Sequence, residues 1–231
     1  MARLPRLVLA DHAHHVIQRG HGSRPVFTDA EDRASYLAAL REAAATEDVS
    51  VHAWALLDRE VQLLATPAEA TGLSRMMQAV GRRYVSAYNR RHGSRGTLWD
   101  GRFRCAVVEP GATRLAVLRL IDGLATEPGL TSAAQRTGAA RDGWLHDPPE
   151  VWLLGNTPFE REAAYAALLA EGLPEASAAG AASAAGAADA ASLRRAALGG
   201  WAAGSAAFAA RTEALASRPA RPRAKGRPRR A

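Results

Sequence analysis

Residues 51–67, VHAWALLDREVQLLATP, place two apolar segments on either side of a short polar turn at residues 58–60. Two such segments joined by a tight turn are typical of a β-hairpin in a protein core. Successive side chains of a strand point to opposite faces, so Glu60, Gln62 and Leu64 share one face of the second strand. The hairpin therefore requires a sheet, and it presents two polar side chains, Glu60 and Gln62, from one core strand.

The clearest helical period lies in residues 73–91. At 100° per residue the apolar side chains of this segment fall on one arc, and arginines gather on the opposite side. These arginines are Arg75, Arg82, Arg83 and Arg90. The period predicts an amphipathic helix with a basic outer stripe.

The other segments complete an alternation of strands and helices. Residues 14–19 and 103–109 are predicted strands, and helices are predicted before the hairpin and over residues 112–124. Thr28 and Glu31 have the spacing of a capping box at the start of the first helix. The order predicts an α+β fold, a ferredoxin-like antiparallel sheet with helices on one face, followed by a helical C-terminal extension and a basic disordered tail.

Composition divides the chain into five segments. They are a main domain (1–130), a connector with a helix (131–172), an Ala/Gly/Ser-rich linker (173–192), a helical segment (193–217) and a basic tail (218–231). The tail has no acidic residue, and its prolines and charge predict disorder when it is free.

The charge of the chain favours a polyanionic partner. A net charge of +7 and a pI near 10.6 are typical of nucleic-acid-binding proteins. A GC-rich genome would explain the preference for arginine over lysine, but it does not explain where the arginines cluster. A single cysteine, Cys105, excludes an internal disulfide. The sequence has no candidate membrane span or secretory signal, so we expect a cytoplasmic protein.

Several motifs together resemble one family. They are MARLPRLV with HHVIQRG near the N-terminus, GRRYVSAYNRRHGSRGTLWDGRF, GNTPFEREAAYAALL, and GWAAGSAAFAARTEAL with KGRPRR near the C-terminus. Over essentially its whole length the chain resembles the REP-associated tyrosine transposases, which are insertion-sequence-200-like single-tyrosine enzymes of the HUH superfamily. The resemblance implies a ferredoxin-like domain that binds single-stranded or hairpin (repeated palindromic) DNA. It also implies a divalent metal, Mg²⁺ or Mn²⁺, and a tyrosine that attacks the DNA phosphate.

The chain departs from that family at the residues that carry the chemistry. The resemblance places two metal-binding histidines at Glu60 and Gln62, and the nucleophilic tyrosine at Leu120. Carboxylate and amide oxygens still suit Mg²⁺ or Mn²⁺, so weak binding at Glu60 and Gln62 remains an alternative to a solvated polar face without metal. His12 and His14 form a rival histidine pair at the start of the first predicted strand. We expect His92 and His146 to be surface residues.

Leu120 offers no hydroxyl for a covalent phosphoryl transfer. Thr113 lies on a similar face but about 10 Å away along the helix axis. The four tyrosines fall in apolar periodic patterns and are predicted to be core residues. They are Tyr36, Tyr84, Tyr88 and Tyr165. The sequence therefore contains no evident replacement nucleophile.

By contrast, the chain retains the clustered basic residues expected of a DNA-binding protein. Arginine forks suit phosphate, and eight arginines between residues 75 and 104 face a single acid, Asp100. The predicted DNA-binding residues are Arg19, Arg75, Arg82, Arg83, Arg90, Arg91, Arg95, Arg102 and Arg104. We expect Trp99, Phe103 and Tyr88 to be buried rather than available for base stacking, and the tail to add a second, non-specific phosphate contact.

The leading hypothesis is a monomeric or homodimeric protein that binds DNA with a transposase-like fold and has lost strand cleavage. The alternatives are an active single-tyrosine transposase with a displaced metal site and nucleophile, and a decaying gene copy. Restoring both histidines and the tyrosine, at positions 60, 62 and 120, is predicted to revive cleavage.

Overall fold

The computed structural model describes residues 5–22, 24–141, 143–173 and 189–222. In chain order its elements are β1 (His14–Arg19), α1 (Ala30–Thr46), β2 (Val49–Leu57), β3 (Glu60–Pro67), α2 (Gly72–Arg91), β4 (Arg104–Val108), α3 (Ala112–Asp122), α4 (Ala133–Arg136), α5 (Pro149–Trp152), α6 (Pro158–Glu171), α7 (Ala190–Gly199), β5 (Ala202–Ala203) and α8 (Ala206–Ala216).

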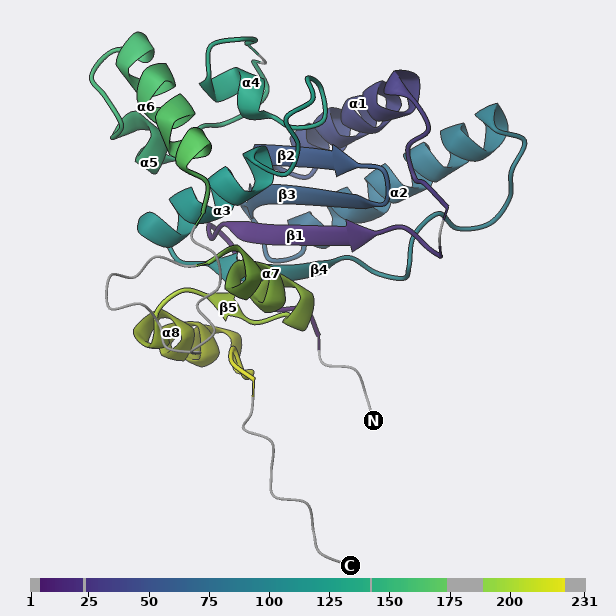
Figure 1. Cartoon of the computed structure of the whole chain (residues 1–231). Coiled ribbons are helices and arrows are strands. Elements are labelled where there is room, and N and C mark those ends of the chain that lie inside the picture. Colours follow the sequence, from purple (N-terminus) through teal and green to yellow (C-terminus); the bar gives the residue numbers. More distant parts are fainter. Residues whose placement is uncertain (1–4, 23, 142, 174–188, 223–231) are drawn as a thin grey trace, which may run out of the picture.

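One sheet, with strand order β2-β3-β1-β4-β5, organises the chain (Figure 1). The predicted hairpin is β2 and β3, which pair antiparallel, and β1 lies between β3 and β4, antiparallel to both. The short strand β5 adds to the edge of β4 in parallel, so the complete sheet is mixed. The α+β class and the ferredoxin-like order of the first four strands are confirmed.

Helices cover both faces of this sheet (Figure 1). Alternate residues of β1 enter two separate hydrophobic clusters, Val16 on the face of α1 and α2 and Ile17 on the face of α3 and α7. The prediction of helices on one face therefore holds for α1 and α2 of the ferredoxin-like unit. The second face is covered by α3 and by α7 of the C-terminal extension, because alternating apolar residues on the central strands leave that face apolar as well.

The amphipathic helix α2 buries its predicted apolar arc. Met76 and Tyr84, which belong to that arc, are at most 1% exposed in the cluster beneath α1 and α2. The start of α1 differs from the prediction, because Asp29 is the N-cap and accepts a hydrogen bond from the backbone N–H of Asp32. Thr28 instead donates its hydroxyl to the Asp32 carboxylate at 2.6 Å.

The helical segment predicted over residues 193–217 consists of two helices, α7 and α8, separated by β5. The α7 helix packs on β4, so this part of the chain completes the sheet's second face. The five-segment division stays a prediction, and most of the linker (174–188) and the end of the tail (223–231) lie outside the described residues. No helix in the described part of the chain is long and apolar enough to cross a membrane.

Candidate nucleic-acid interface

The two positions that the resemblance assigns to metal-binding histidines lie at the start of β3, facing α7. Glu60 is 8% exposed and Gln62 is fully buried. The prediction that Glu60 and Gln62 lie on a solvated polar face of the sheet is therefore wrong. Arg194 of α7, far along the chain, contacts Glu60 at this end of β3, and hairpin periodicity alone does not reveal this contact.

Arg194 of α7 fills the space over Glu60. Its Nη1 and Nη2 atoms each donate a 2.6 Å hydrogen bond to one Glu60 carboxylate oxygen, and Arg19 Nε contacts Oε2 at 3.3 Å. This fork-to-fork geometry is the strongest arginine–carboxylate arrangement. Burial on its own raises the pKa of Glu60, but the hydrogen bonds from Arg194 and Gln62 outweigh it and hold the pKa below its ordinary value. Glu60 is therefore an ionised carboxylate at neutral pH.

Gln62 extends this pair into the core. Its amide Nε2 donates to Glu60 Oε1 at 2.7 Å, so its carbonyl Oε1 faces His15 and accepts from His15 Nε2 at 2.7 Å. Since an ionised carboxylate only accepts, this chain of bonds places the His15 proton on Nε2. The other ring nitrogen, Nδ1, is buried without a hydrogen-bond partner among the described residues. Burial lowers the pKa of His15 to about 4, so the ring is neutral at pH 7.

These residues do not fit a divalent metal. Both Glu60 oxygens bind a guanidinium, which carries the same sign of charge as the ion, and the Gln62 oxygen is occupied by His15. Within the described residues, no group of three or more His, Cys, Asp or Glu side chains is arranged to hold a metal ion. The weak Mg²⁺ or Mn²⁺ site considered for Glu60 and Gln62 would thus have to displace an existing ion pair.

The rival histidine pair has other partners. His12 Nδ1 contacts the Ala10 carbonyl at 2.7 Å, and His14 Nε2 accepts from the Leu9 backbone N–H at 3.2 Å. His14 is completely buried, and burial lowers its pKa to about 3. Strand alternation turns His14 to the face opposite His15, so it does not meet Glu60 or Gln62.

No tyrosine of the chain reaches the surface. All four are described, and each is at most 2% exposed. The Tyr165 hydroxyl donates to Asp122 at 2.7 Å and the Tyr84 hydroxyl donates to the Val26 carbonyl, while burial raises the pKa of both. Leu120 lies half-buried on α3, packed on the same hydrophobic cluster that α7 covers, and Thr113 is buried at the start of α3. The prediction of core tyrosines is confirmed.

The predicted basic stripe is partly neutralised by α1 and its flanking residues. Arg75 pairs with Glu47 at 2.5 Å and with Glu69 at 3.1 Å, and Arg83 pairs with Glu42. Arg91 pairs with a cluster at the start of α1. Its partners are Asp29, Glu31 and Asp32. The count of one acid against eight arginines was therefore wrong as a measure of local charge, because these acids come from elsewhere in the chain.

His92 also belongs to this cluster and is not a free surface residue. Its Nε2 lies 3.0 Å from the Asp32 carboxylate, and its ring centroid lies 4.2 Å from that of Tyr88. His146 is exposed, as expected. Trp99, Phe103 and Tyr88 are at most 6% exposed, so their predicted burial is confirmed.

The other predicted arginines remain exposed without an ion pair to a described residue. They are Arg82, Arg90, Arg95, Arg102 and Arg104. Arg104 is the first residue of β4 and Arg102 lies just before it, and both line a pocket together with residues near both ends of the described chain. Sequence analysis did not single out Arg194, Arg6 or Trp201, although Arg6 and Trp201 lie inside motifs that carry the resemblance. Arg218 is the first residue of the predicted basic tail, but no spacing signal links these residues to one another.

Comparisons with known proteins add fold-level similarities at low identity. No family model and no curated protein matches the chain. The structure is similar to that of a REP-associated tyrosine transposase bound to a REP hairpin, with 10% identity over 62% of this chain and 76% of that one, and a TM-score of 0.45. It is also similar to a transposase candidate from Deinococcus radiodurans, with 21% identity over 47% of this chain and 88% of that one, and a TM-score of 0.37.

Proposed function

We propose that this protein binds single-stranded or hairpin DNA with a transposase-like fold and does not cleave the strand. The observation that carries the second half of the proposal is the pairing of Arg194 with both carboxylate oxygens of Glu60. An arginine fork occupies the position where the motif resemblance calls for the first metal-binding histidine. A fixed positive charge there opposes cation binding.

The nucleophile is missing for an independent reason. In-line attack on phosphorus requires an accessible hydroxyl held next to the scissile phosphate. Leu120 has no hydroxyl, and every tyrosine hydroxyl of the chain lies in the core. Burial raises the pKa of Tyr36, Tyr84 and Tyr165, so their phenolates are further disfavoured.

DNA binding rests on the arginines that have no acid partner among the described residues. Arg82 and Arg90 lie on the outer side of α2, Arg95 lies in the loop after it, and Arg102 and Arg104 lie at the start of β4. Phosphate contacts by such side chains release counterions, so affinity falls steeply as salt rises. Because the aromatic side chains beneath this surface are buried, we assign recognition of the backbone to the arginines rather than to base stacking at Trp99 or Phe103.

The test is an incubation of the full chain with a labelled palindromic hairpin DNA and Mn²⁺ or Mg²⁺. We expect a retarded complex that weakens steeply between 50 and about 200 mM salt, with no nicked strand and no covalent adduct on a denaturing gel. A matched hairpin of scrambled loop sequence measures specificity. The variant Arg41→Gln, which removes an exposed arginine of α1 outside the proposed surface, should bind like the parent.

Nicking or a covalent adduct in this experiment would support an active transposase and overturn the proposal that the protein does not cleave DNA. Absence of binding to hairpin and single-stranded DNA at low salt would overturn the DNA-binding proposal itself and favour a decaying copy.

A further inference from the structure

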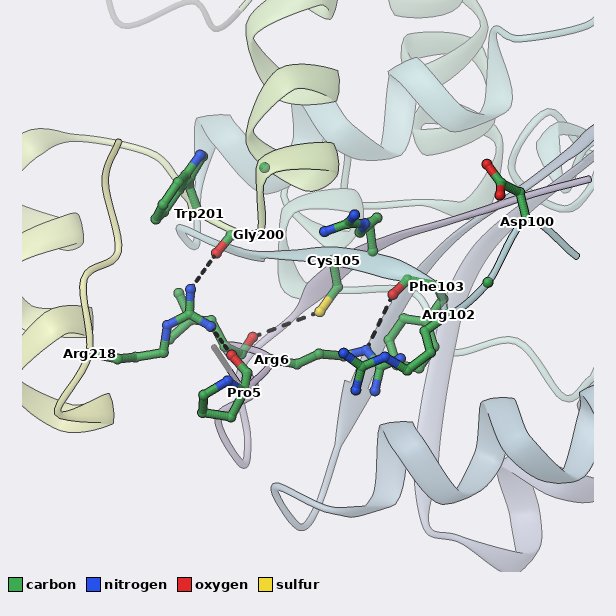
Figure 2. A pocket seen from close by; sticks show the side chains of 13 residues that line it. Pro5, Arg6, Asp100, Arg102, Phe103, Cys105, Gly200, Trp201 and Arg218 are labelled. Carbon is green, nitrogen blue, oxygen red and sulfur yellow. Dashed lines mark hydrogen bonds between the residues drawn. The ribbon is translucent and has the colours of Figure 1, made fainter. Parts of the chain in front are cut away.

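A pocket of about 360 Å³ lies where the two ends of the described chain meet the start of β4 (Figure 2). Its walls come from residues 5–7, residues 100–105, the turn between α7 and β5, and Arg218. The volume falls in the range of small-molecule sites and suits one nucleotide unit. Because Trp201 and Arg218 belong to the C-terminal part of the chain, the pocket forms only when that part packs on the sheet.

The charge in this pocket is strongly one-sided. Arg6, Arg102, Arg104 and Arg218 line it, and Asp100 is the single acid in the lining. Asp100 lies at the far end of the lining from Arg218 (Figure 2). No ion pair to a described carboxylate neutralises any of the four arginines. Four neighbouring guanidiniums without a counter-charge create a local positive potential that a bound anion would relieve.

Two of these arginines are held in fixed positions by neutral groups. Arg6 Nε donates to the Phe103 carbonyl at 3.2 Å, and its guanidinium stacks 3.9 Å above the centre of the Phe103 ring. Arg218 donates to the carbonyls of Pro5 and Gly200, which ties the C-terminal segment to the N-terminal one. Burial lowers the pKa of Arg6, and the neighbouring Arg102 lowers it further, while burial also lowers the pKa of Arg218. The charge of both arginines is partly buried, and no described carboxylate pairs with it.

Trp201 supplies an aromatic wall on the side of the pocket where Gly200 and Arg218 lie, with Arg102 on the other side (Figure 2). Its ring lies directly against Gly199, where an added Cβ would collide with the indole. The indole is half-exposed, unlike Trp99 and Phe103, which are at most 6% exposed. A half-exposed tryptophan in one pocket with exposed arginines is the combination that single-stranded nucleic-acid sites use to stack a base and hold its phosphate.

We infer that this pocket binds one nucleotide unit, with its phosphate on Arg102 and Arg104 and its base against Trp201. Arg6 and Arg218 shape the pocket and add to its positive potential. The inference deepens the proposed DNA binding, on which it rests, by assigning an unpaired nucleotide of the bound strand to a site that includes the C-terminal extension. A free nucleotide shares this chemistry, so the test separates the two sources.

The experiment compares the double variant Arg102→Gln/Arg104→Gln with the double variant Arg41→Gln/Arg195→Gln. All four side chains are exposed and have no ion pair to a described residue, so both variants should fold and carry the same change in charge. The probes are thymidine monophosphate, thymidine, and a fluorescein-labelled single-stranded tetranucleotide, measured by calorimetry and by anisotropy. We expect the pocket variant to bind the monophosphate and the tetranucleotide about tenfold or more weakly, because charge-assisted hydrogen bonds are lost. The control variant should keep the affinity of the parent, and thymidine should bind poorly to all three proteins.

A third variant, Trp201→Ala, tests the base contact. Its affinity for the tetranucleotide should fall roughly fivefold to a hundredfold, whereas its affinity for an abasic deoxyribose-phosphate oligomer should be unchanged. Equal weakening by the pocket and control variants, or equal loss of both oligomers in Trp201→Ala, would overturn the inference.

Failure of the proposed function has a different signature. The protein could bind the monophosphate through Arg102 and Arg104 and yet bind neither hairpin nor single-stranded DNA. This result would support a pocket for a free nucleotide and overturn the proposed DNA binding. Hairpin binding without any effect of Arg102, Arg104 or Trp201 would support DNA binding and overturn the pocket.

Discussion

Arg194 and Glu60, which are 134 residues apart in the sequence, form a two-pronged ion pair with both hydrogen bonds at 2.6 Å. The Glu60 side chain is 11% exposed and the Arg194 side chain is 35% exposed. This pair joins α7 to the first residue of β3. Both carboxylate oxygens at the position where the resemblance places a metal ligand are therefore bound to a guanidinium.

Removing the arginine should destabilise the fold. Arg194→Ala leaves a mostly buried carboxylate with only Arg19 and Gln62 as partners, so we expect the free energy of unfolding to fall by about 1–3 kcal/mol. Urea denaturation followed by circular dichroism measures it. Arg195→Ala removes the adjacent exposed arginine and should change stability by no more than about 0.5 kcal/mol. Equal losses in the two variants would show that the Glu60 contact adds nothing.

Acid should weaken the fold through the buried histidines. Burial lowers the pKa of His14 to about 3 and those of His15 and His52 to about 4, from an ordinary value of 6.5. Between these pKa values the unfolded chain binds protons at histidines that stay neutral in the folded chain. The free energy of unfolding therefore has its full value above about pH 6.5 and decreases as the pH drops towards about 4. His15→Gln can keep the donor to Gln62, and it should make this slope shallower by about 1.4 kcal/mol per pH unit. An unchanged slope in urea titrations at pH 4.5–6.5 would contradict a neutral buried His15.

Arginines with and without acid partners should contribute differently to DNA affinity. Arg90→Gln and Arg95→Gln remove free guanidiniums, so each should weaken hairpin binding and reduce the salt slope of log K by about one. Arg75→Gln and Arg83→Gln remove arginines already paired with Glu47, Glu69 or Glu42, and should have smaller effects. Anisotropy titrations at several salt concentrations make the comparison. Larger losses in the paired set would mean that DNA displaces the acids.

Reconstruction of a metal site should require α7 as well as β3. Arg194 lies against the side chain at position 60, so in Glu60→His/Gln62→His we expect its guanidinium to stay near the new rings and repel a cation. We expect this double variant to bind Mn²⁺ weakly, and the triple variant that adds Arg194→Ala to bind it at least about tenfold more tightly in calorimetry. Adding Leu120→Tyr should then produce nicking of hairpin DNA only in the variant that also carries Arg194→Ala. Equal Mn²⁺ affinity with and without Arg194 would contradict the role assigned to it.

Much of the fold could be predicted because its signals are local. The hairpin at residues 51–67, the apolar arc of α2 and the burial of the four tyrosines each follow from periodicity within one element. The start of α1 was less predictable, since Asp29 and Thr28 are neighbours that both offer capping oxygens; Asp29 caps the helix, and the Thr28 hydroxyl donates to Asp32.

The candidate site could be predicted only in part. Periodicity placed Glu60 and Gln62 together on one face of β3, but it gave no information about what would cover that face. The acids that neutralise Arg75, Arg83 and Arg91 come mainly from α1 and its flanks, and counting charges along α2 could not find them. The arginine pocket combines both ends of the described chain with the start of β4, so no window of sequence contains it.

The sequence by itself determined which side chains stand at three positions: Glu60, Gln62 and Leu120, where the resemblance calls for two histidines and a tyrosine. The tertiary structure alone decided which partners Glu60 and Gln62 have, because side chains distant along the chain meet only after α7 packs on the sheet. Burial then makes each polar group require a partner, and this requirement joins Arg194, Glu60, Gln62 and His15 into one hydrogen-bonded chain.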